Sequence, residues 1–66
     1  MSVRINGEDL SVVSLTTVAA LIDQRKIRPE TAVVEYNGVI LARDKWEATA
    51  LKENDTLEIL SFVGGG

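Results

Sequence analysis

The sequence predicts an α+β roll, in which a mixed sheet of four to five strands is covered on one face by a single main helix. Two observations lead to this class. Near both ends of the chain, residues 1–5 and 56–59 alternate apolar and polar side chains, a pattern typical of strands with one buried face. Between them, residues 18–22 carry an apolar stripe with helical spacing. One helix therefore has to cover the apolar face of the sheet.

The composition limits both the size of the domain and its chemistry. The 66 residues are 45% apolar and include neither cysteine nor histidine, so the fold depends on packing, and a thiol or imidazole mechanism is excluded. We expect no bound metal. The net charge of −3 disfavours binding to a nucleic-acid backbone. Because the sequence has no signal-like segment and no long apolar span, we expect a cytoplasmic protein that does not enter a membrane.

The N-terminal segment predicts a hairpin over residues 1–13. Apolar and polar side chains alternate on both sides of the dipeptide Asn6-Gly7. This dipeptide suits the two positive φ angles of a type I′ turn. Val3 and Ile5, on the first strand, are expected to face the core.

The chain then contains its one convincing helix. Ser14, Thr16 and Thr17 offer hydroxyl caps before an apolar stripe. The stripe consists of Val18, Leu21 and Ile22. We expect the helix to end near Lys26, because basic side chains suit the C-terminal end of a helix and Pro29 cannot continue its hydrogen bonds. Ile27 is expected to enter the core directly after the helix.

A second pair of strands is predicted around another tight turn. Residues 31–36 are rich in β-branched side chains, Asn37-Gly38 again suits a turn, and residues 39–41 form a short apolar run. The order of apolar and turn residues therefore predicts a second hairpin.

Two polar segments connect this hairpin to the last strand. Residues 43–47 show no clear period, so we assign them to a turn or a single helical turn, with Trp46 half buried for packing rather than function. Residues 52–55 form a polar turn. The conceivable acid-base pairs in these segments are Arg43 with Asp44 and Glu53 with Asp55. Charged residues in polar turns are ordinarily solvated, so we expect no autonomous catalytic site there.

The last strand is predicted over residues 56–62. Leu57 and Ile59 alternate with polar residues and are expected to face the core. Leu60 and Phe62 are then left on the outside, where two exposed apolar side chains suggest a docking surface.

The chain ends with Val63 followed by Gly64, Gly65 and Gly66. Glycine has no Cβ, so such a segment can enter a slot that any side chain would block. Four extended residues span about 14 Å. We expect a folded domain over residues 1–63 and a flexible tail over residues 64–66 that presents a terminal carboxylate. A frayed chain end is the alternative interpretation.

The predicted element order is strand, strand, helix, strand, short strand, strand, which allows the first and last strands to pair in parallel at the centre of the sheet. This is the ubiquitin-like β-grasp arrangement. Within it, a specific combination of residues is present: Glu35, Asn37-Gly38, Arg43, Trp46, Leu51, Asp55, Leu57-Glu58-Ile59 and Phe62-Val63-Gly64-Gly65-Gly66. By this combination the chain resembles the ThiS family, the sulfur carrier proteins of thiamine biosynthesis, over essentially its whole length. Asn54 stands where the family often has glycine, and asparagine also tolerates a left-handed backbone.

The resemblance implies a protein co-substrate rather than an enzyme. A ThiF-like adenylating enzyme would use ATP and Mg to activate the carboxylate of Gly66, and a persulfide donor would supply the sulfur of a C-terminal thiocarboxylate. A ThiG-like thiazole synthase would take this sulfur for the thiazole ring of thiamine. The residues expected to serve partner docking and tail insertion are Leu60, Phe62, Val63, Gly64 and Gly65.

Other interpretations of the same tail stay open. The small subunit of molybdopterin synthase is similar in fold and in its Gly-Gly end, although it usually carries prolines before the glycines, and the only proline here is Pro29. A sulfur carrier for such another pathway is one alternative. A ubiquitin-like modifier, joined through Gly66 to lysines, is a second. A pure binding module, which would keep its function without the glycines, is a third.

Overall fold

The structure is a computed structural model that describes residues 1–62. Its elements in chain order are strands β1 (Ser2–Ile5) and β2 (Glu8–Ser11), helix α1 (Val18–Gln24), the 3₁₀ turn η1 (Pro29–Thr31), strands β3 (Ala32–Tyr36) and β4 (Val39–Leu41), the 3₁₀ turn η2 (Arg43–Lys45) and strand β5 (Thr56–Ser61). Val63 and the predicted tail over residues 64–66 lie outside the described residues.

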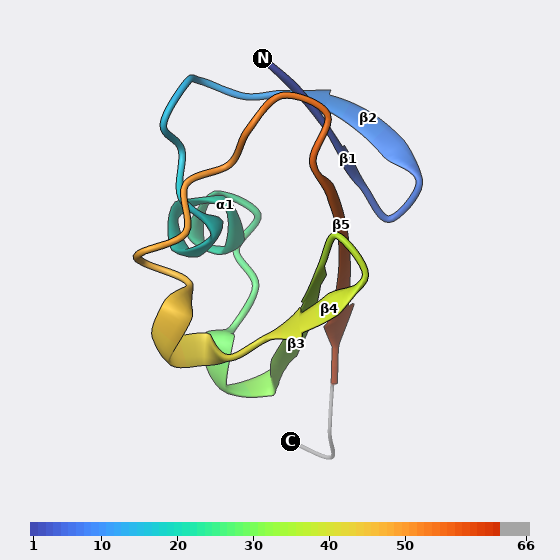
Figure 1. Ribbon diagram of the computed structural model, residues 1–66. Coiled ribbons are helices and arrows are strands. Elements are labelled where there is room, and N and C mark those ends of the chain that lie inside the picture. Colours follow the sequence, from blue (N-terminus) through green and yellow to red (C-terminus); the bar gives the residue numbers. More distant parts are fainter. Residues whose placement is uncertain (63–66) are drawn as a thin grey trace.

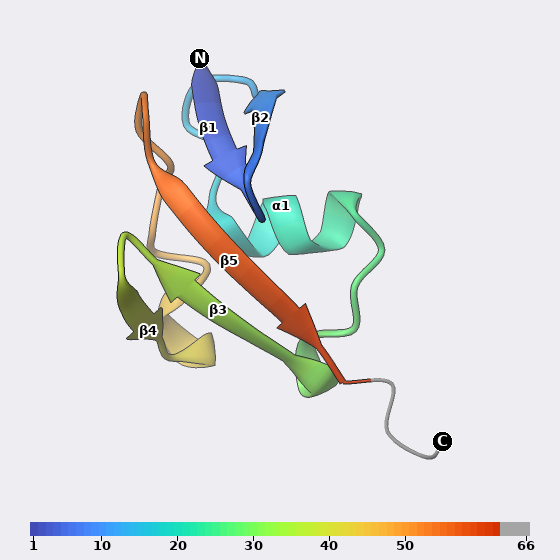
Figure 2. The same cartoon turned by 90° about the vertical axis from the view of Figure 1, so that its right-hand side faces the viewer.

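Within residues 1–62, five strands form one mixed sheet in the order β2-β1-β5-β3-β4 (Figures 1 and 2). β1 and β5 pair in parallel at its centre, with Ile5 opposite Leu57. The other neighbouring strands are antiparallel. The predicted β-grasp arrangement, with the first and last strands side by side, is confirmed. In Figure 2, β5 crosses the middle of the sheet.

Both predicted tight turns are present. Asn6 and Gly7 have φ angles of 51° and 84°, and Asn37 and Gly38 have φ angles of 50° and 89°. Two successive positive φ angles are the property that a type I′ turn requires. The Asn-Gly dipeptides therefore close the two hairpins, β1 with β2 and β3 with β4.

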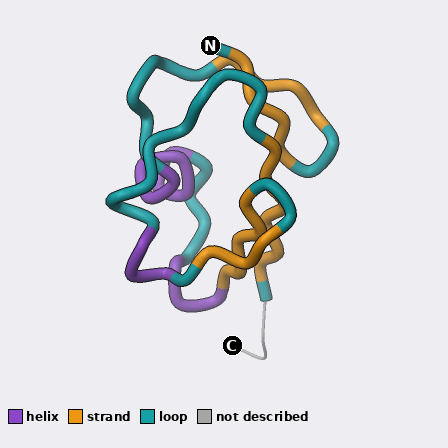
Figure 3. The backbone as a smooth tube through the Cα atoms, in the orientation of Figure 1, coloured by secondary structure: helices purple, strands orange, loops and turns teal. Residues whose placement is uncertain are grey.

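Helix α1 covers one face of the sheet (Figures 1 and 3). Of the three hydroxyl caps that the sequence offers, Thr17 is the N-cap, because its Oγ1 accepts the Ala20 N–H at 3.1 Å. At the other end, Lys26 adopts a left-handed φ of 58°, and the Ile27 N–H donates to the Ile22 carbonyl at 3.1 Å. This is a Schellman ending. It turns Ile27 onto the core, as predicted.

Trp46 is only 3% exposed, so the prediction of a half-buried side chain is wrong. Trp46 is buried because two hydrogen bonds join its segment to the start of the helix. The donors are the first two N–H groups of α1, which have no partner inside the helix. The Val18 N–H donates to the Thr49 carbonyl at 2.9 Å, and the next N–H, of Ala19, donates to the Trp46 carbonyl at 3.2 Å. The segment after η2 is thereby fixed against the helix start. The indole ring enters the core, where its Nε1–H donates to the Leu41 carbonyl at 3.1 Å.

The core lies between α1 and the inner face of the sheet. Its buried apolar residues are Val3, Ile5, Val12, Val18, Leu21, Ile22, Val34, Trp46, Leu51, Leu57 and Ile59. The inward positions of Leu57 and Ile59 confirm the predicted register of the last strand. Figure 2 looks onto the opposite face, which no element within residues 1–62 covers.

Candidate functional site

Strand β5 delivers the end of the chain to one end of the sheet. Ser61 pairs with Ala32 of β3, and the Phe62 N–H then donates to the Thr31 carbonyl at 2.7 Å. Beyond this bond the sequence continues with Val63, Gly64 and Gly65, which are predicted to serve docking and tail insertion, and with Gly66, the predicted site of adenylation. All four lie outside the described residues. The predicted tail therefore follows directly on a fixed point of the sheet.

Leu60 and Phe62 lie outside the core, as the alternation along β5 predicts. Their side chains are 60% and 57% exposed, respectively. The predicted outward direction of both residues is confirmed. Their role in docking stays a prediction.

Leu60 belongs to a larger surface that sequence reasoning missed. On the uncovered face, a shallow hollow of about 280 Å³ is lined by Val33, Glu35, Ile40, Glu58 and Leu60. We name these five residues the outer patch. Val33 of β3 lies opposite Leu60 of β5, and Ile40 of β4 lies opposite Glu35. The sequence signal for this surface was the pair Val33-Val34. Neighbouring apolar residues on one strand place one side chain on each face of the sheet, so one of the two valines had to lie on the outer face.

Two acidic residues of the outer patch face each other across neighbouring strands. Glu35 of β3 is directly opposite Glu58 of β5. Both are exposed, and both alternate with inward-facing residues of their own strands, so their side chains leave the same face. The ion pair found within residues 1–62 joins Arg4 to Asp9 at 3.1 Å. Neither glutamate has a cationic partner in that part of the chain.

A separate polar cluster surrounds Asp55, which is only 5% exposed. Its Oδ2 accepts the Tyr36 O–H at 2.5 Å and the Lys52 N–H at 2.7 Å. Its Oδ1 accepts the Asn37 side-chain amide at 3.2 Å. Burial by itself would raise the pKa of Asp55, but the hydrogen bonds outweigh burial and hold this pKa below its usual range. The cluster ties the β3–β4 hairpin to the loop before β5, so the expectation that Asp55 is solvated is wrong.

The conceivable acid-base pairs do not form sites. Glu53 accepts the Ser2 N–H at 3.0 Å, while the Asp55 oxygens are occupied by other donors. Arg43 and Asp44 are both exposed on η2.

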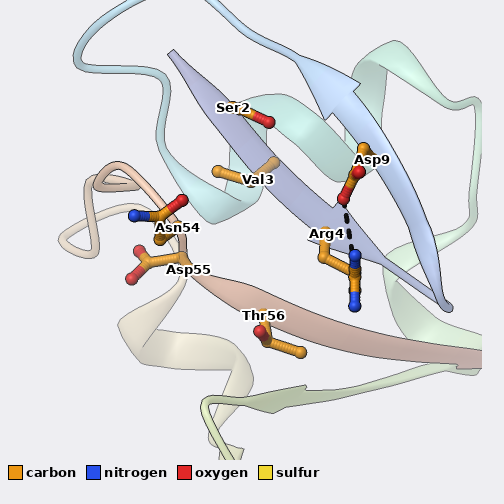
Figure 4. Close-up of a pocket in the computed structure, with 7 residues that line it drawn as sticks. All are labelled: Ser2, Val3, Arg4, Asp9, Asn54, Asp55 and Thr56. Atoms are coloured by element: carbon orange, nitrogen blue, oxygen red, sulfur yellow. Dashed lines mark hydrogen bonds and ion pairs between the residues drawn. The ribbon is translucent and has the colours of Figure 1, made fainter.

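A polar hollow of about 200 Å³ lies beside the Asp55 cluster (Figure 4). It is lined by Ser2, Val3, Arg4, Asp9, Asn54, Asp55 and Thr56. Arg4 and Asp9 point toward one another, and the Asp55 carboxylate points away from them. In the described part of the chain, no three acidic side chains gather as a metal-binding group. The hollow therefore does not combine its charged groups into a metal or acid-base site.

No helix within residues 1–62 is long and apolar enough to cross a membrane.

Within residues 1–62, the sheet is mixed, its first and last strands pair in parallel at the centre, and one α-helix covers it. These features define a ubiquitin-like β-grasp protein. Comparison with known families identifies the particular group. The family model described as the ThiS family matches residues 3–66. The chain therefore belongs to the ThiS family.

Individual relatives agree with this assignment. The sulfur carrier protein ThiS of Bacillus subtilis is 30% identical over 64 residues, which covers 96% of this chain and 97% of that protein. The crystal structure of the thiamine biosynthesis protein ThiS from Geobacter metallireducens is similar with a TM-score of 0.84 and 35% identity, over 100% of both chains.

Two longer relatives are named thiazole synthase. Those of Magnetococcus marinus and Paramagnetospirillum magneticum are each 33% identical to this chain over 66 residues. The match covers 100% of this chain and 20% of each relative, so the chain spans about a fifth of their length.

Proposed function

We propose that this protein is a sulfur carrier of thiamine biosynthesis, whose C-terminal Gly66 is adenylated and converted to a thiocarboxylate that donates sulfur for the thiazole ring. The single observation that carries the proposal is that the ThiS family match extends through Gly66 itself. The fixed end of β5 supports it, because the sheet holds the chain up to Phe62, directly before the residues that have to enter a partner.

The proposed chemistry begins with activation of the Gly66 carboxylate, because a carboxylate is a poor electrophile. The Gly66 carboxylate attacks the α-phosphate of ATP on a ThiF-like adenylating enzyme that uses Mg, and pyrophosphate leaves. The terminal sulfur of a persulfide donor then attacks the acyl carbon and displaces AMP, which gives an acyl disulfide. A thiol attacks the donor's sulfur in this disulfide and releases the thiocarboxylate, while the donor becomes a disulfide with that thiol. The thiocarboxylate is ionised near neutral pH and is a competent nucleophile.

The carrier's own residues bind the partner enzymes and allow Gly66 to reach their active sites. Gly64 and Gly65 have no side chains, so they allow Gly66 to enter a narrow active site. Leu60 and Phe62 supply exposed apolar area for docking, beside the point where the chain leaves the sheet. All catalytic groups belong to the partners, while Gly66 of this protein, their co-substrate, is the group that reacts and carries the sulfur.

The proposed sulfur acceptor is a ThiG-like thiazole synthase. The support is that about a fifth of two proteins named thiazole synthase is similar to this chain over all 66 residues. A carrier segment within the same polypeptide as the synthase has a high effective concentration at its acceptor. We infer that the carrier described here serves an acceptor of the same kind.

The test is to follow what Gly66 becomes. The intact protein is incubated with its adenylating enzyme, ATP, Mg and a persulfide donor, and is then analysed by mass spectrometry. We expect a mass gain equal to the difference between sulfur and oxygen, with fragmentation placing it on Gly66. Deletion of Gly66 should abolish the gain and leave the thermal midpoint unchanged. A gain without Gly66, or a product linked to lysine of another protein, would overturn the proposal.

A further inference from the structure

We propose that Glu35 and Glu58 together bind one arginine side chain of the adenylating enzyme, and that this contact orients the carrier on that enzyme. The inference rests on the proposed function and adds the chemistry by which the partner is recognised. It starts from Glu35 and Glu58, which line the outer patch on the uncovered face of the sheet. The strands that carry them, β3 and β5, lie side by side in Figure 2.

The pair of Glu35 and Glu58 destabilises the carrier when no partner is bound. Glu35 and Glu58 are directly opposite in the antiparallel register of β3 and β5. Side chains in this relation have Cβ atoms about 5 Å apart, and like charges there are destabilising. Arg4 also leaves this face of the sheet, but its Nε donates to Asp9 at 3.1 Å. Proteins keep such a destabilising arrangement mainly at functional sites, so the repulsion between Glu35 and Glu58 is expected if this surface serves binding.

The surroundings of the pair favour arginine as its ligand. Val33, Ile40 and Leu60 line the same hollow of about 280 Å³. A guanidinium group is planar, carries five N–H donors and is weakly hydrated, so it can bridge two carboxylates while its faces contact apolar side chains. An ammonium group is compact and strongly hydrated, and it fits this mixed apolar and acidic lining less well. Arginine is also enriched among the residues that dominate protein interfaces.

The adenylating enzyme is the partner that this charge pattern fits. The four residues beyond Phe62 reach about 14 Å at full extension, so the carrier has to dock close to the bound ATP. A site that binds ATP and stabilises departing pyrophosphate is surrounded by cationic groups. The carrier approaches it with a net charge of −3 and with two carboxylates on the outer patch that have no cationic partner within residues 1–62. Charge complementarity and the short reach of the tail therefore both favour the adenylating enzyme as the partner that binds the outer patch.

The experiment compares Glu58→Gln and Glu35→Gln with the matched control Glu47→Gln. Glu47 is an exposed carboxylate on the segment after η2, so its replacement removes the same charge away from the outer patch. We expect Glu58→Gln and Glu35→Gln each to weaken binding to the adenylating enzyme, measured by calorimetry without ATP, at least about tenfold. The same two variants should raise the thermal midpoint of the free carrier by about 2 to 4 °C, because the cross-strand repulsion is removed. Glu47→Gln should change binding less than about twofold.

Two further readouts complete the test. Added salt should weaken binding of the parent protein more than binding of Glu58→Gln. A Glu58→Arg variant should bind poorly, and one arginine-to-glutamate substitution on the adenylating enzyme should restore its binding. The inference is overturned if the two outer-patch variants bind as tightly as the parent protein, or lose no more affinity than Glu47→Gln.

The outcome is distinguishable from failure of the proposed function. At saturating enzyme, the outer-patch variants should still reach full thiocarboxylate formation, since they alter docking and leave Gly66 unchanged. If the parent protein gains no sulfur, the proposed function fails. If the parent gains sulfur and the variants bind normally, only the arginine contact is wrong.

Discussion

Asn6 bonds the backbone of Ile59 twice: its Oδ1 accepts the Ile59 N–H at 2.7 Å, and its Nδ2 donates to the Ile59 carbonyl at 3.2 Å. The side chain thereby imitates a neighbouring strand and extends the β1–β5 ladder beyond the end of β1. Asn6 also has the φ of 51° that the hairpin turn requires. One residue therefore closes the first hairpin and holds the last strand.

Replacement of Asn6 by glycine should separate these two roles. Glycine accepts the positive φ, so the turn is kept, but both bonds to Ile59 are lost. We expect the free energy of unfolding to fall by about 1 to 3 kcal/mol in a denaturant titration, because partly buried backbone groups lose their partners. Asn54→Gly is the matched control. Asn54 has a φ of 71° and is held by its backbone N–H, which donates to the Ser2 carbonyl at 2.8 Å, so this change should cost less than about 0.5 kcal/mol.

Lys26 occupies a position that glycine would fill with less strain. Its φ of 58° lies in the left-handed region, which costs a side-chain-bearing residue about 1 to 2 kcal/mol. Glycine loses about 0.4 to 1 kcal/mol through its greater freedom in the unfolded chain. We therefore expect Lys26→Gly to raise the free energy of unfolding by about 0.5 to 1 kcal/mol. Arg25→Gly should lower it, since Arg25 has an ordinary φ of −86°. A loss of stability in Lys26→Gly would contradict the Schellman assignment.

The Asp55 cluster predicts how stability depends on pH. The pKa of Asp55 is lowered in the folded state, so its contribution is present above the ordinary carboxyl pKa of about 3.9 and is lost as pH falls through the lower folded value. The pKa of Tyr36 is raised, by burial and by its bond to Asp55. Its contribution is present below the ordinary value of about 10 and is lost as pH rises through the folded value. Unfolding measured against pH should show Asp55→Asn losing the acid-side step, and Tyr36→Phe losing the alkaline one.

The same residues explain how far the sequence could predict the fold. Turn chemistry, alternation and the helical stripe are local, and they predicted both hairpins, helix α1 and the inward positions of Leu57 and Ile59. The errors at Trp46 and Asp55 have a shared cause. Each side chain is buried by partners far along the chain, the start of α1 for Trp46 and Tyr36 for Asp55, and no local pattern reports such contacts.

On the outer face of the sheet, too, local patterns predicted which side chains are exposed but not which strands are neighbours. Alternation along β5 predicted that Leu60 is exposed. It did not reveal the register that places Val33 beside Leu60, or Glu35 opposite Glu58. An outer patch built from three strands becomes visible only when their pairing is known.

Leu60→Asp tests whether the outer patch is a docking surface. The side chain is 60% exposed, so the free energy of unfolding should change by less than about 1 kcal/mol. A carboxylate at this position removes apolar contact area and adds a third negative charge to the outer patch. We expect the KM of the carrier in the adenylation reaction to rise at least about tenfold, while the rate at saturation stays near that of the parent protein.

The matched control for this change is Leu15→Asp. Leu15 is 80% exposed and belongs to the loop between β2 and α1. In Figure 1 this loop lies far from the end of β5. It has a φ of 72°, which aspartate also tolerates, so the substitution places the same new charge on an apolar surface without disturbing the backbone. We expect Leu15→Asp to be adenylated with an unchanged KM. If both variants raise KM equally, the effect is one of net charge, and if Leu60→Asp unfolds or is adenylated normally, Leu60 has no part in docking.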